Sequence, residues 1–301
     1  MRARSSLARL QQAFVFVLLG AASAWLWWHW ARSPGVALVG AFVIVFAYSI
    51  FLAVEFVLLK VVGTDAQAPP PTWGDAIRAW WAETCTTPRV FFWRQPFRWH
   101  AEPDYLPAPG GGKRGIVFIH GFVCNRGFWN PWLREMREAG HPFAAVNLEP
   151  VFGSIERYSP IVEDAVQRVT QATGLAPILV CHSMGGLAAR AWLRANDGAG
   201  RVHHVVTIGT PHRGTWLGRF SRTGNGRQMR LDGDWVTQLA QHRPAVPFTC
   251  WHANCDNIVF PSTTATLPGA DNRFVRGVAH VQLAFIPEVI AHTRLLLAGG
   301  K

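Results

Sequence analysis

Ser183 lies in the sequence pattern of a nucleophilic serine. Residues 178–181, Ile-Leu-Val-Cys, form a short apolar run that predicts a buried parallel strand. Gly185 follows the serine by two positions, in an expected helix over residues 184–196. A strand, a tight turn and a helix with a serine at the turn are typical of a nucleophile elbow, which raises the hydroxyl above the sheet. The alternative is that Ser183 only caps the helix, since serine is a favoured N-cap residue.

A serine hydroxyl needs a base within hydrogen-bond reach before it attacks a carbonyl group. His280 and Asp256 each follow shortly after an expected strand, and the order Ser, Asp, His is the order that elbow-type hydrolases use. In the predicted triad, His280 accepts the proton of Ser183, while Asp256 holds the imidazole tautomer and stabilises the imidazolium. Asp271 is the rival acid.

A second motif follows the expected strand over residues 114–119. Gly121 comes shortly after the strand end, where glycine lets the backbone turn sharply. We expect the backbone N–H groups of Met184 and Phe122 to form the oxyanion hole. The alternative is an ordinary strand-to-loop glycine. The residues next to these positions are the predicted substrate-binding residues: His120, Gly121 and His182.

Helical and strand patterns alternate along the catalytic part of the chain. Strands that alternate with helices predict a parallel α/β sheet, whose ligands bind at the carboxyl ends of the strands. The segment 91–100 also has strand character. Expected strands cover residues 114–119, 143–148, 178–181, 202–208, 248–252 and 274–278, and expected helices cover residues 132–138, 155–173, 184–196 and 281–297.

The regular alternation breaks over residues 215–241, where glycines, arginines and aromatic residues mix. A long irregular insertion beside a predicted active site is a candidate lid. The alternative is a surface excursion that has no gating role.

Two apolar runs begin the chain, over residues 13–30 and 36–62. Both are near the ~20 residues that a membrane-spanning helix needs, so the sequence predicts a transmembrane hairpin. A cleaved signal peptide and a pair of buried core helices are the alternatives. Glu55 lies inside the second run, and a carboxyl group there must either snorkel or find a partner.

Arginines flank the hairpin unevenly. Arg2, Arg4 and Arg9 precede it, whereas Arg32 alone lies in its turn. The positive-inside rule therefore predicts that both ends of the hairpin, and the catalytic domain, face the cytoplasm. A linker over residues 63–89 follows, with a helix over 73–86 that either lies on the membrane surface or packs on the domain.

The composition limits which partners and metal sites the chain can have. Of 301 residues, 29 are Lys or Arg and 18 are Asp or Glu, which gives a net charge of +11. A basic surface suits anionic lipid headgroups, acidic substrates or nucleic acid. No nucleic-acid-binding motif is present, so we expect no nucleic-acid partner. The 5 cysteines show no metal-binding spacing, and no metal site is expected.

The chain resembles the α/β-hydrolase family, and within it the bacterial triacylglycerol lipases and esterases, over roughly residues 90–298. The resemblance implies a mostly parallel eight-stranded sheet, carboxylic-ester hydrolysis and no organic cofactor. Cys181 departs from the pattern, because glycine or alanine is usual before the elbow. The matching segments are Ile119-His120-Gly121-Phe122, Cys181-His182-Ser183-Met184-Gly185-Gly186, residues 207–214, residues 256–261 and Gly277-Val278-Ala279-His280.

The sequence thus predicts a membrane anchor over residues 1–62, a linker over 63–89 and an α/β-hydrolase domain over 90–301. We expect a serine hydrolase of the bacterial inner membrane that cleaves lipid or small-molecule esters through an acyl-enzyme intermediate. One alternative is an acyltransferase, thioesterase or amidase with the same site, and another is a non-catalytic membrane scaffold. The sequence does not predict the oligomeric state.

Overall fold

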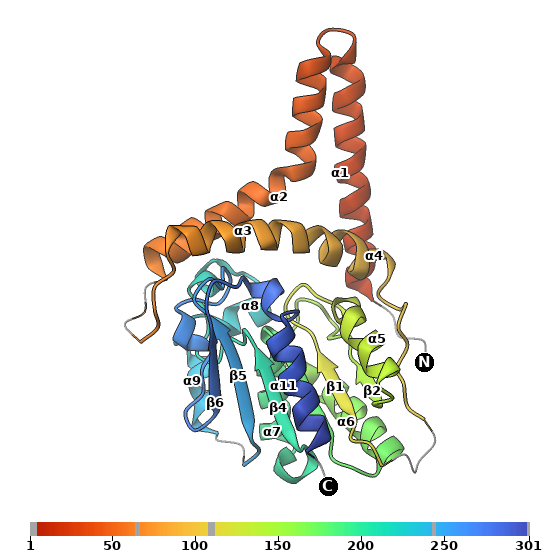
Figure 1. Ribbon diagram of the computed structural model, residues 1–301, viewed down its shortest axis with the longest axis vertical. Helices are drawn as coiled ribbons and strands as arrows, with labels where there is room; N and C mark the ends of the chain where they lie inside the picture. The colour runs from red at the N-terminus through yellow and green to blue at the C-terminus, as the bar shows by residue number, and fades with distance from the viewer. Residues whose placement is uncertain (1–4, 64, 66, 108–111, 243–244, 300–301) are drawn as a thin grey trace.

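The computed structural model describes residues 5–63, 65, 67–107, 112–242 and 245–299. It consists of a helical hairpin and an α/β domain on which the hairpin stands. The helix α3 (Trp73–Thr87) lies across the domain at the base of the hairpin (Figure 1).

Six strands form one sheet in the order β2-β1-β3-β4-β5-β6, and every neighbouring pair is parallel. This confirms the predicted parallel α/β architecture. The expected number of strands was wrong, since the described residues form six rather than eight. The strands are β1 (Ile116–Ile119), β2 (Phe143–Ala145), β3 (Ile178–His182), β4 (His204–Ile208), β5 (Phe248–Ala253) and β6 (Asp271–Val275).

Alternate residues of the central strands enter two different hydrophobic cores, as the pleat of a strand requires. Val117 and Ile119 of β1 belong to one core, whereas Ile116 and Phe118 belong to the other. All four side chains are fully buried. The helices α6 (Ser159–Thr173) and α7 (Met184–Ala195) cover the first face, and α5 (Asn130–Glu138) and α11 (Pro287–Ala298) cover the second (Figure 1).

The predicted strand over residues 91–100 was wrong. The chain continues without a break from α3 into a π-helix, Pro88–Arg94, and the short helix α4, Gln95–Phe97. Pro88 lacks the N–H that a continuing helix would use, and the carbonyl oxygen of Thr84, four residues earlier, accepts a 3.1 Å hydrogen bond from Tyr48 Oη. Helical continuity and the burial of Val90 therefore override the strand propensity of the aromatic residues. This is why no strand precedes β1 among the described residues.

Proline also divides the expected helix over residues 281–297. The structure has a short helix, α10 (His280–Leu283), and then α11, which has Pro287 in its first turn. The remaining short elements are the 3₁₀ turns Arg126–Trp129, Ile155–Tyr158, Gly198–Arg201, Trp216–Phe220 and Ser262–Ala265, and the helices α8 (Gly224–Gln228) and α9 (Asp234–Gln241).

The predicted lid over residues 215–241 contains the 3₁₀ turn Trp216–Phe220, α8 and α9. Asn225 Nδ2 donates to the carbonyl oxygen of Val151 at 2.8 Å and to the hydroxyl of Tyr158 at 3.1 Å. The ring of Trp216 stacks on Phe260 with 5.9 Å between centroids. These contacts hold the segment against the domain, and its motion stays a prediction.

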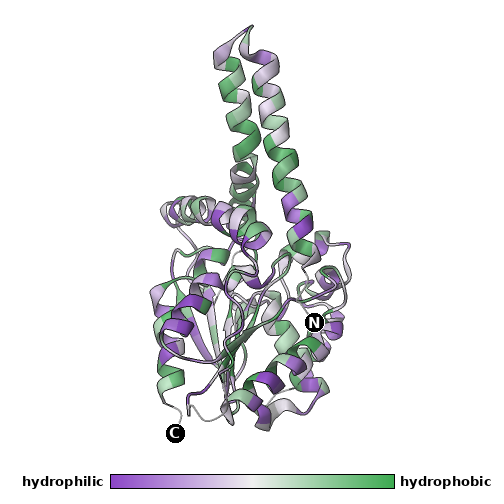
Figure 2. Ribbon diagram, turned by 90° about the vertical axis from the view of Figure 1, so that its right-hand side faces the viewer, coloured by the Kyte–Doolittle hydropathy of each residue, from purple (hydrophilic) through white to green (hydrophobic). Residues whose placement is uncertain are grey.

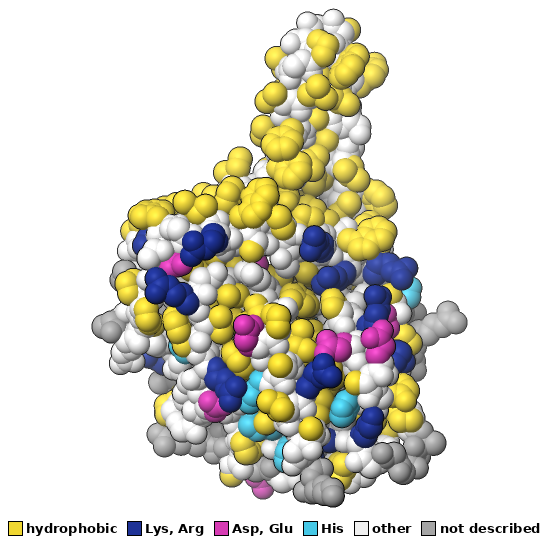
Figure 3. All heavy atoms as spheres, viewed as in Figure 1, with side chains coloured by type: hydrophobic (Ala, Val, Ile, Leu, Met, Phe, Trp, Pro, Cys, Tyr) yellow, Lys and Arg dark blue, Asp and Glu magenta, His cyan; other side chains and the backbone are white. Residues whose placement is uncertain are grey.

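The hairpin consists of α1 (Ser6–Trp30) and α2 (Pro34–Val62), capped at their N-termini by Ser5 and Ser33. Both helices are long and apolar enough to cross a membrane. The segment His280–Ala298 also passes by length and composition, but it packs into the domain. Figure 2 shows the hydrophobic character of the hairpin, and Figure 3 shows apolar side chains over the hairpin and along its base.

The C-terminal half of α2 packs against the domain rather than standing free. Its buried residues recur at helical spacing, with Leu52, Glu55, Phe56 and Leu59 on one face. Glu55 therefore has a partner and does not snorkel, since its carboxylate accepts a 2.6 Å hydrogen bond from Asn257 Nδ2.

The predicted helix after the linker is present as α3. Ala76, Ala79 and Glu83 face the protein and are buried, whereas the opposite side exposes Ile77 and Trp81. Packing on the domain and presentation of an apolar surface are thus both properties of this helix.

Candidate active site

Ser183 lies at the turn between β3 and α7 in a strained backbone conformation. Its φ of 53° and ψ of −127° lie in a region that residues with side chains seldom adopt. A Cβ atom on Gly185 would meet the carbonyl oxygen of His120 at 2.8 Å, and one on Gly186 would run into Thr210. The turn therefore requires small residues after the serine, as a nucleophile elbow does.

Cys181 occupies the position where the sequence departs from the usual pattern. Its side chain is fully buried in the core between β1 and β4, whose Ile119 and Thr207 are its register partners. Burial raises the pKa of the Cys181 thiol, so it stays protonated. The sulfur thus acts as a small apolar group inside the core.

His280 and Asp256 form a buried hydrogen-bonded pair. His280 Nδ1 lies 2.9 Å from Asp256 Oδ2, and the two residues are 4% and 2% exposed. The other oxygen of Asp256 accepts hydrogen bonds from the backbone N–H groups of Ile258 and Val259, at 3.0 and 2.7 Å. The carboxylate is therefore oriented toward the imidazole.

The rival acid is elsewhere. Asp271 is exposed at the start of β6 and forms an ion pair with Arg273 at 2.7 Å. The pairing of His280 with Asp256 excludes Asp271 as its partner in this structure.

The segments after β3, β5 and β6 bring the three predicted triad residues to one edge of the sheet. A Cβ atom on Gly209, after β4, would lie 3.0 Å from Asp256 Oδ2 and 3.1 Å from His280 Nδ1. A Cβ atom on Gly121, after β1, would lie 2.8 Å from the Cβ of Ser183. The two glycines therefore allow the backbone to approach the site closely.

His182 connects the nucleophile turn to the predicted base. Its ring lies 4.7 Å from the ring of His280, centroid to centroid, and its Nε2 lies 3.2 Å from the His280 carbonyl oxygen. On its other side it stacks on Phe128 at 4.5 Å. Burial holds the pKa of His182 well below its usual value, so the ring is neutral. These contacts favour a positioning role over direct contact with substrate.

The pKa of His280 reflects opposing effects. Burial lowers it, but the Asp256 carboxylate, the hydrogen bond to it, and the carboxyl groups of Glu83 and Glu55 raise it by more. The pKa of His280 therefore lies above its ordinary value.

The loop after β1 adopts the geometry that a close approach to Ser183 requires. Val123, next to Phe122, has a φ of 52°. His120 Nε2 accepts a hydrogen bond from Leu148 N at 3.0 Å, and its Nδ1 lies 2.9 Å from the Gly121 carbonyl oxygen. Both ring nitrogens are thus used within the protein, which favours His120 as a support of the loop rather than a contact to substrate.

Sequence reasoning missed a group of polar residues behind His280. Glu83 of α3 is 1% exposed, and its two carboxylate oxygens accept hydrogen bonds from the backbone N–H groups of Val281 and Gln282. Asn257 Oδ1 accepts from the backbone N–H of His280 at 3.3 Å. The one signal in the sequence was Glu55, a carboxyl group inside an apolar run.

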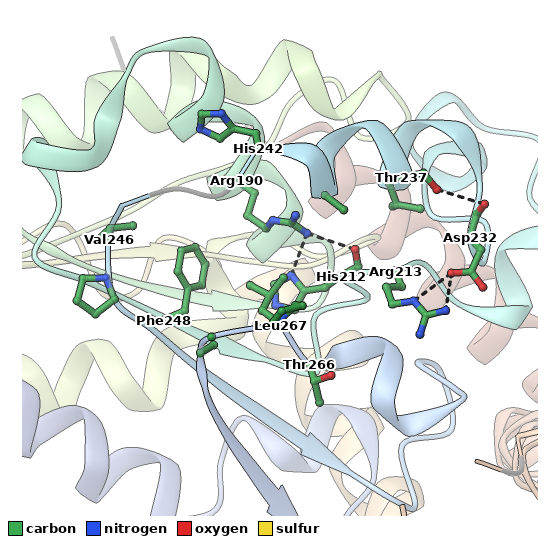
Figure 4. Close-up of a pocket in the computed structure, with 16 residues that line it drawn as sticks. Arg190, His212, Arg213, Asp232, Thr237, His242, Val246, Phe248, Thr266 and Leu267 are labelled. Atoms are coloured by element: carbon green, nitrogen blue, oxygen red, sulfur yellow. Dashed lines mark hydrogen bonds and ion pairs between the residues drawn. The ribbon is translucent and has the colours of Figure 1, made fainter. Parts of the chain in front are cut away.

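A separate cavity of about 440 Å³ lies beside α9 and the start of β5 (Figure 4). It is lined by Arg190 and His212 but by none of the predicted triad residues. Arg190 is 3% exposed and donates to the carbonyl oxygens of His212 and Leu239, both at 3.2 Å. Burial lowers its pKa to about 10, so it stays charged at neutral pH. We infer that Arg190 stabilises the packing of α7 against α9 and against the loop after β4.

The comparisons with known proteins agree with this fold. A model of the alpha/beta hydrolase family matches residues 116–297. The chain is similar to the mature form of the Bacillus licheniformis lipase BlEst2, with 19% sequence identity and a TM-score of 0.57 over 64% of this chain and 96% of that chain. It is also similar to Aspergillus fumigatus lipase B, with 16% identity and a TM-score of 0.54 over 64% of this chain and 55% of that chain. At these identities the likeness shows the shared fold.

Proposed function

Because the chain belongs to the α/β-hydrolase family, we propose that it is a membrane-anchored serine hydrolase that cleaves carboxylic esters. The two solved structures named above are described as lipases, which favours lipid or small-molecule ester substrates. Fold alone does not determine chemistry, so the proposal rests on the arrangement of the site.

The observation that carries the proposal is the buried His280–Asp256 pair beside a strained serine. The 2.9 Å bond from His280 Nδ1 to Asp256 leaves His280 Nε2 free to accept a proton. Ser183 stands at a turn with a φ of 53°, which only a surrounding structure that holds it in place maintains. A serine that merely caps a helix needs neither feature.

The reaction follows from these positions. Ser183 Oγ attacks the ester carbonyl carbon while its proton passes to His280 Nε2. The backbone N–H groups of Phe122 and Met184 stabilise the negative charge on the carbonyl oxygen. The alkoxide then leaves with the proton from His280, and the acyl group remains bound to Ser183. Water, deprotonated by His280, then attacks the acyl-enzyme, and His280 returns this proton to Ser183 Oγ as the bond to the acyl group breaks and the acid is released.

The hairpin would hold this site beside lipid substrates. Its two helices are candidate membrane spans, and apolar side chains continue along its base on α3 and the adjacent π-helix. The arginine distribution favours a domain on the cytoplasmic side.

The test is hydrolysis of p-nitrophenyl esters from acetate to palmitate by the detergent-solubilised full chain and by Ser183→Ala. We expect wild-type turnover and a loss of about 10³-fold or more in the variant. The best acyl length separates an esterase from a lipase. If an added alcohol diverts the acyl group into a new ester in preference to free acid, the chain is a transferase. A wild-type protein that hydrolyses no ester and is not labelled by a fluorophosphonate would be a scaffold.

A further inference from the structure

We propose that Glu83 of α3 and Glu55 of α2 are positioning residues for His280, so that the N-terminal helices complete the catalytic centre. This inference rests on the proposed function. Both residues precede the part of the chain that the family model matches, which begins at residue 116. The N-terminal helices would then position the catalytic base in addition to anchoring the protein in the membrane.

Glu83 holds the helix that begins at the catalytic base. Glu83 Oε1 accepts a 2.9 Å hydrogen bond from Val281 N, and Oε2 accepts a 3.1 Å bond from Gln282 N. These are the two residues that follow His280 in α10. The N-terminal N–H groups of a helix have no partner inside the helix, so this carboxylate supplies what α10 lacks. The backbone of His280 is thereby fixed from a helix 198 residues earlier in the chain.

Glu55 reaches the same backbone through one intermediate residue. Its Oε2 accepts a 2.6 Å hydrogen bond from Asn257 Nδ2, and Asn257 Oδ1 accepts the His280 N–H at 3.3 Å. Asn257 also directly follows the triad acid, Asp256. A shift of Glu55 therefore moves the side chain that holds both the base and the loop of the acid.

The two supporting helices are fastened to each other. Trp80 Nε1 of α3 donates to the carbonyl oxygen of Ser49 in α2 at 2.9 Å, and Tyr48 Oη of α2 donates to the carbonyl oxygen of Thr84 at 3.1 Å. Thr84 is the neighbour of Glu83 in the sequence. The position of Glu83 is thus tied to the hairpin.

Charge gives a second, separable effect. Among the described residues, the ionisable groups that act on His280 are Asp256, Glu83, Glu55 and the neutral His182. The three carboxyl groups all favour the imidazolium form. Burial raises the pKa of Glu83 to about 7, so this carboxyl group is only partly ionised where His280 titrates. Its removal therefore lowers the pKa of His280 by less than the loss of Asp256 would, and moves the acidic limb of the pH–rate profile to lower pH.

The experiment compares full-length variants by kcat, KM and pH profile, with kcat counted per serine labelled by a fluorophosphonate. Glu83→Gln keeps one acceptor oxygen and loses the other, so we expect kcat to fall by about 10- to 100-fold with KM little changed. Glu55→Gln keeps an oxygen that accepts from Asn257 but loses the negative charge, so we expect a smaller fall in kcat than in Glu83→Gln, together with an acidic limb at lower pH. Glu55→Leu leaves Asn257 without its acceptor and should lower kcat as well.

The control is Glu135→Gln, which removes a surface carboxylate that pairs with Arg294. It should leave kcat and the pH profile unchanged. If Glu83→Gln and Glu55→Gln both keep the wild-type kcat and the wild-type acidic limb, the two residues do not position His280. Folding losses alone would lower the number of labelled serines without moving the pH profile, and that result also overturns the proposal. Full activity of Ser183→Ala would instead reject the proposed function itself.

Discussion

His182 Nε2 lies 3.2 Å from the carbonyl oxygen of His280, so the residue before the nucleophile contacts the backbone of the predicted base. The ring of His182 is also packed between His280 and Phe128. The histidine ring therefore fixes the distance between the elbow and α10. It does so in its neutral form, since burial holds its pKa well below the usual value.

We expect His182→Phe to keep the ring stacking and lose the hydrogen bond, and His182→Ala to lose both. One hydrogen bond contributes about 1 kcal/mol, so kcat should fall about fivefold in the first variant and further in the second. KM should change little if the substrate does not touch this ring. Steady-state kinetics check that kcat decreases from wild type to His182→Phe and then to His182→Ala. His141→Ala, at the opposite end of the sheet before β2, is the control and should match wild type. Equal kcat in all of them would remove His182 from the site.

The pH dependence follows from the state that the base must have. A general base has to be neutral, so kcat/KM should fall as the pH drops through the pKa of His280. Its neighbours hold that pKa above its usual value of about 6.5, so the midpoint should lie above this pH. A profile that stays flat down to about pH 5 would contradict His280 as the base.

Asp256→Asn tests the acid of the same pair. The amide cannot hold the imidazole in the required tautomer, and comparable substitutions lower kcat by about 10⁴-fold. The residual activity should also have its acidic limb at lower pH, because a carboxylate beside His280 is lost. Asp271→Asn is the matched control, since Asp271 is exposed and forms an ion pair with Arg273 at the surface. Wild-type activity in Asp256→Asn would remove this residue from the triad.

Cys181→Ala should keep catalysis and lower stability. The side chain is fully buried in the core, and loss of its sulfur leaves a small cavity that costs about 1 kcal/mol. The elbow itself needs no sulfur at this position, because Gly185 and Gly186 provide the close contacts. Thermal unfolding should show a lower Tm while kcat stays within about threefold of wild type. A loss comparable to that of Ser183→Ala would show that the thiol takes part in the chemistry.

Much of the candidate site was predictable because its residues follow strand ends. Short apolar runs before His120, Ser183 and Asp256 identify buried parallel strands, and parallel strands bring their carboxyl ends to one edge. Chain order then narrowed twelve histidines to His280. These inferences use only local patterns and one rule of sheet topology.

The parts that were not predicted depend on contacts between distant segments. The strand propensity of residues 91–100 is local, and it is overridden by the helix that precedes them. The role of Glu83 depends on packing against residues 198 and 199 positions later. No periodicity in one sequence encodes such a partner. The expected count of eight strands was wrong because it came from the family resemblance and not from the residues of this chain.

The free part of the hairpin is short for a membrane. Residues 17–30 of α1 are about 21 Å long, whereas the hydrocarbon core is about 30 Å thick. The tip nevertheless carries Trp27, Trp28 and Trp30, and the guanidinium of Arg32 lies 5.2 Å from the ring of Trp28. Such residues belong at a membrane–water interface, so we expect the tip to reach the far side. The apolar side chains at the base of the hairpin, on α3 and the π-helix, would then have to lie in the membrane–water interface on the side of the domain.

Cysteine labelling tests this arrangement. In a Cys85→Ser background, which removes the exposed native thiol, Ser33→Cys at the tip and Glu138→Cys on the domain are compared. An impermeant maleimide applied to intact cells should label the tip but not the domain, and should label both after permeabilisation. This result follows if the tip crosses to the outer face and the domain stays in the cytoplasm. If neither position is labelled in intact cells and both are labelled after permeabilisation, the hairpin enters the bilayer from the side of the domain and does not cross it.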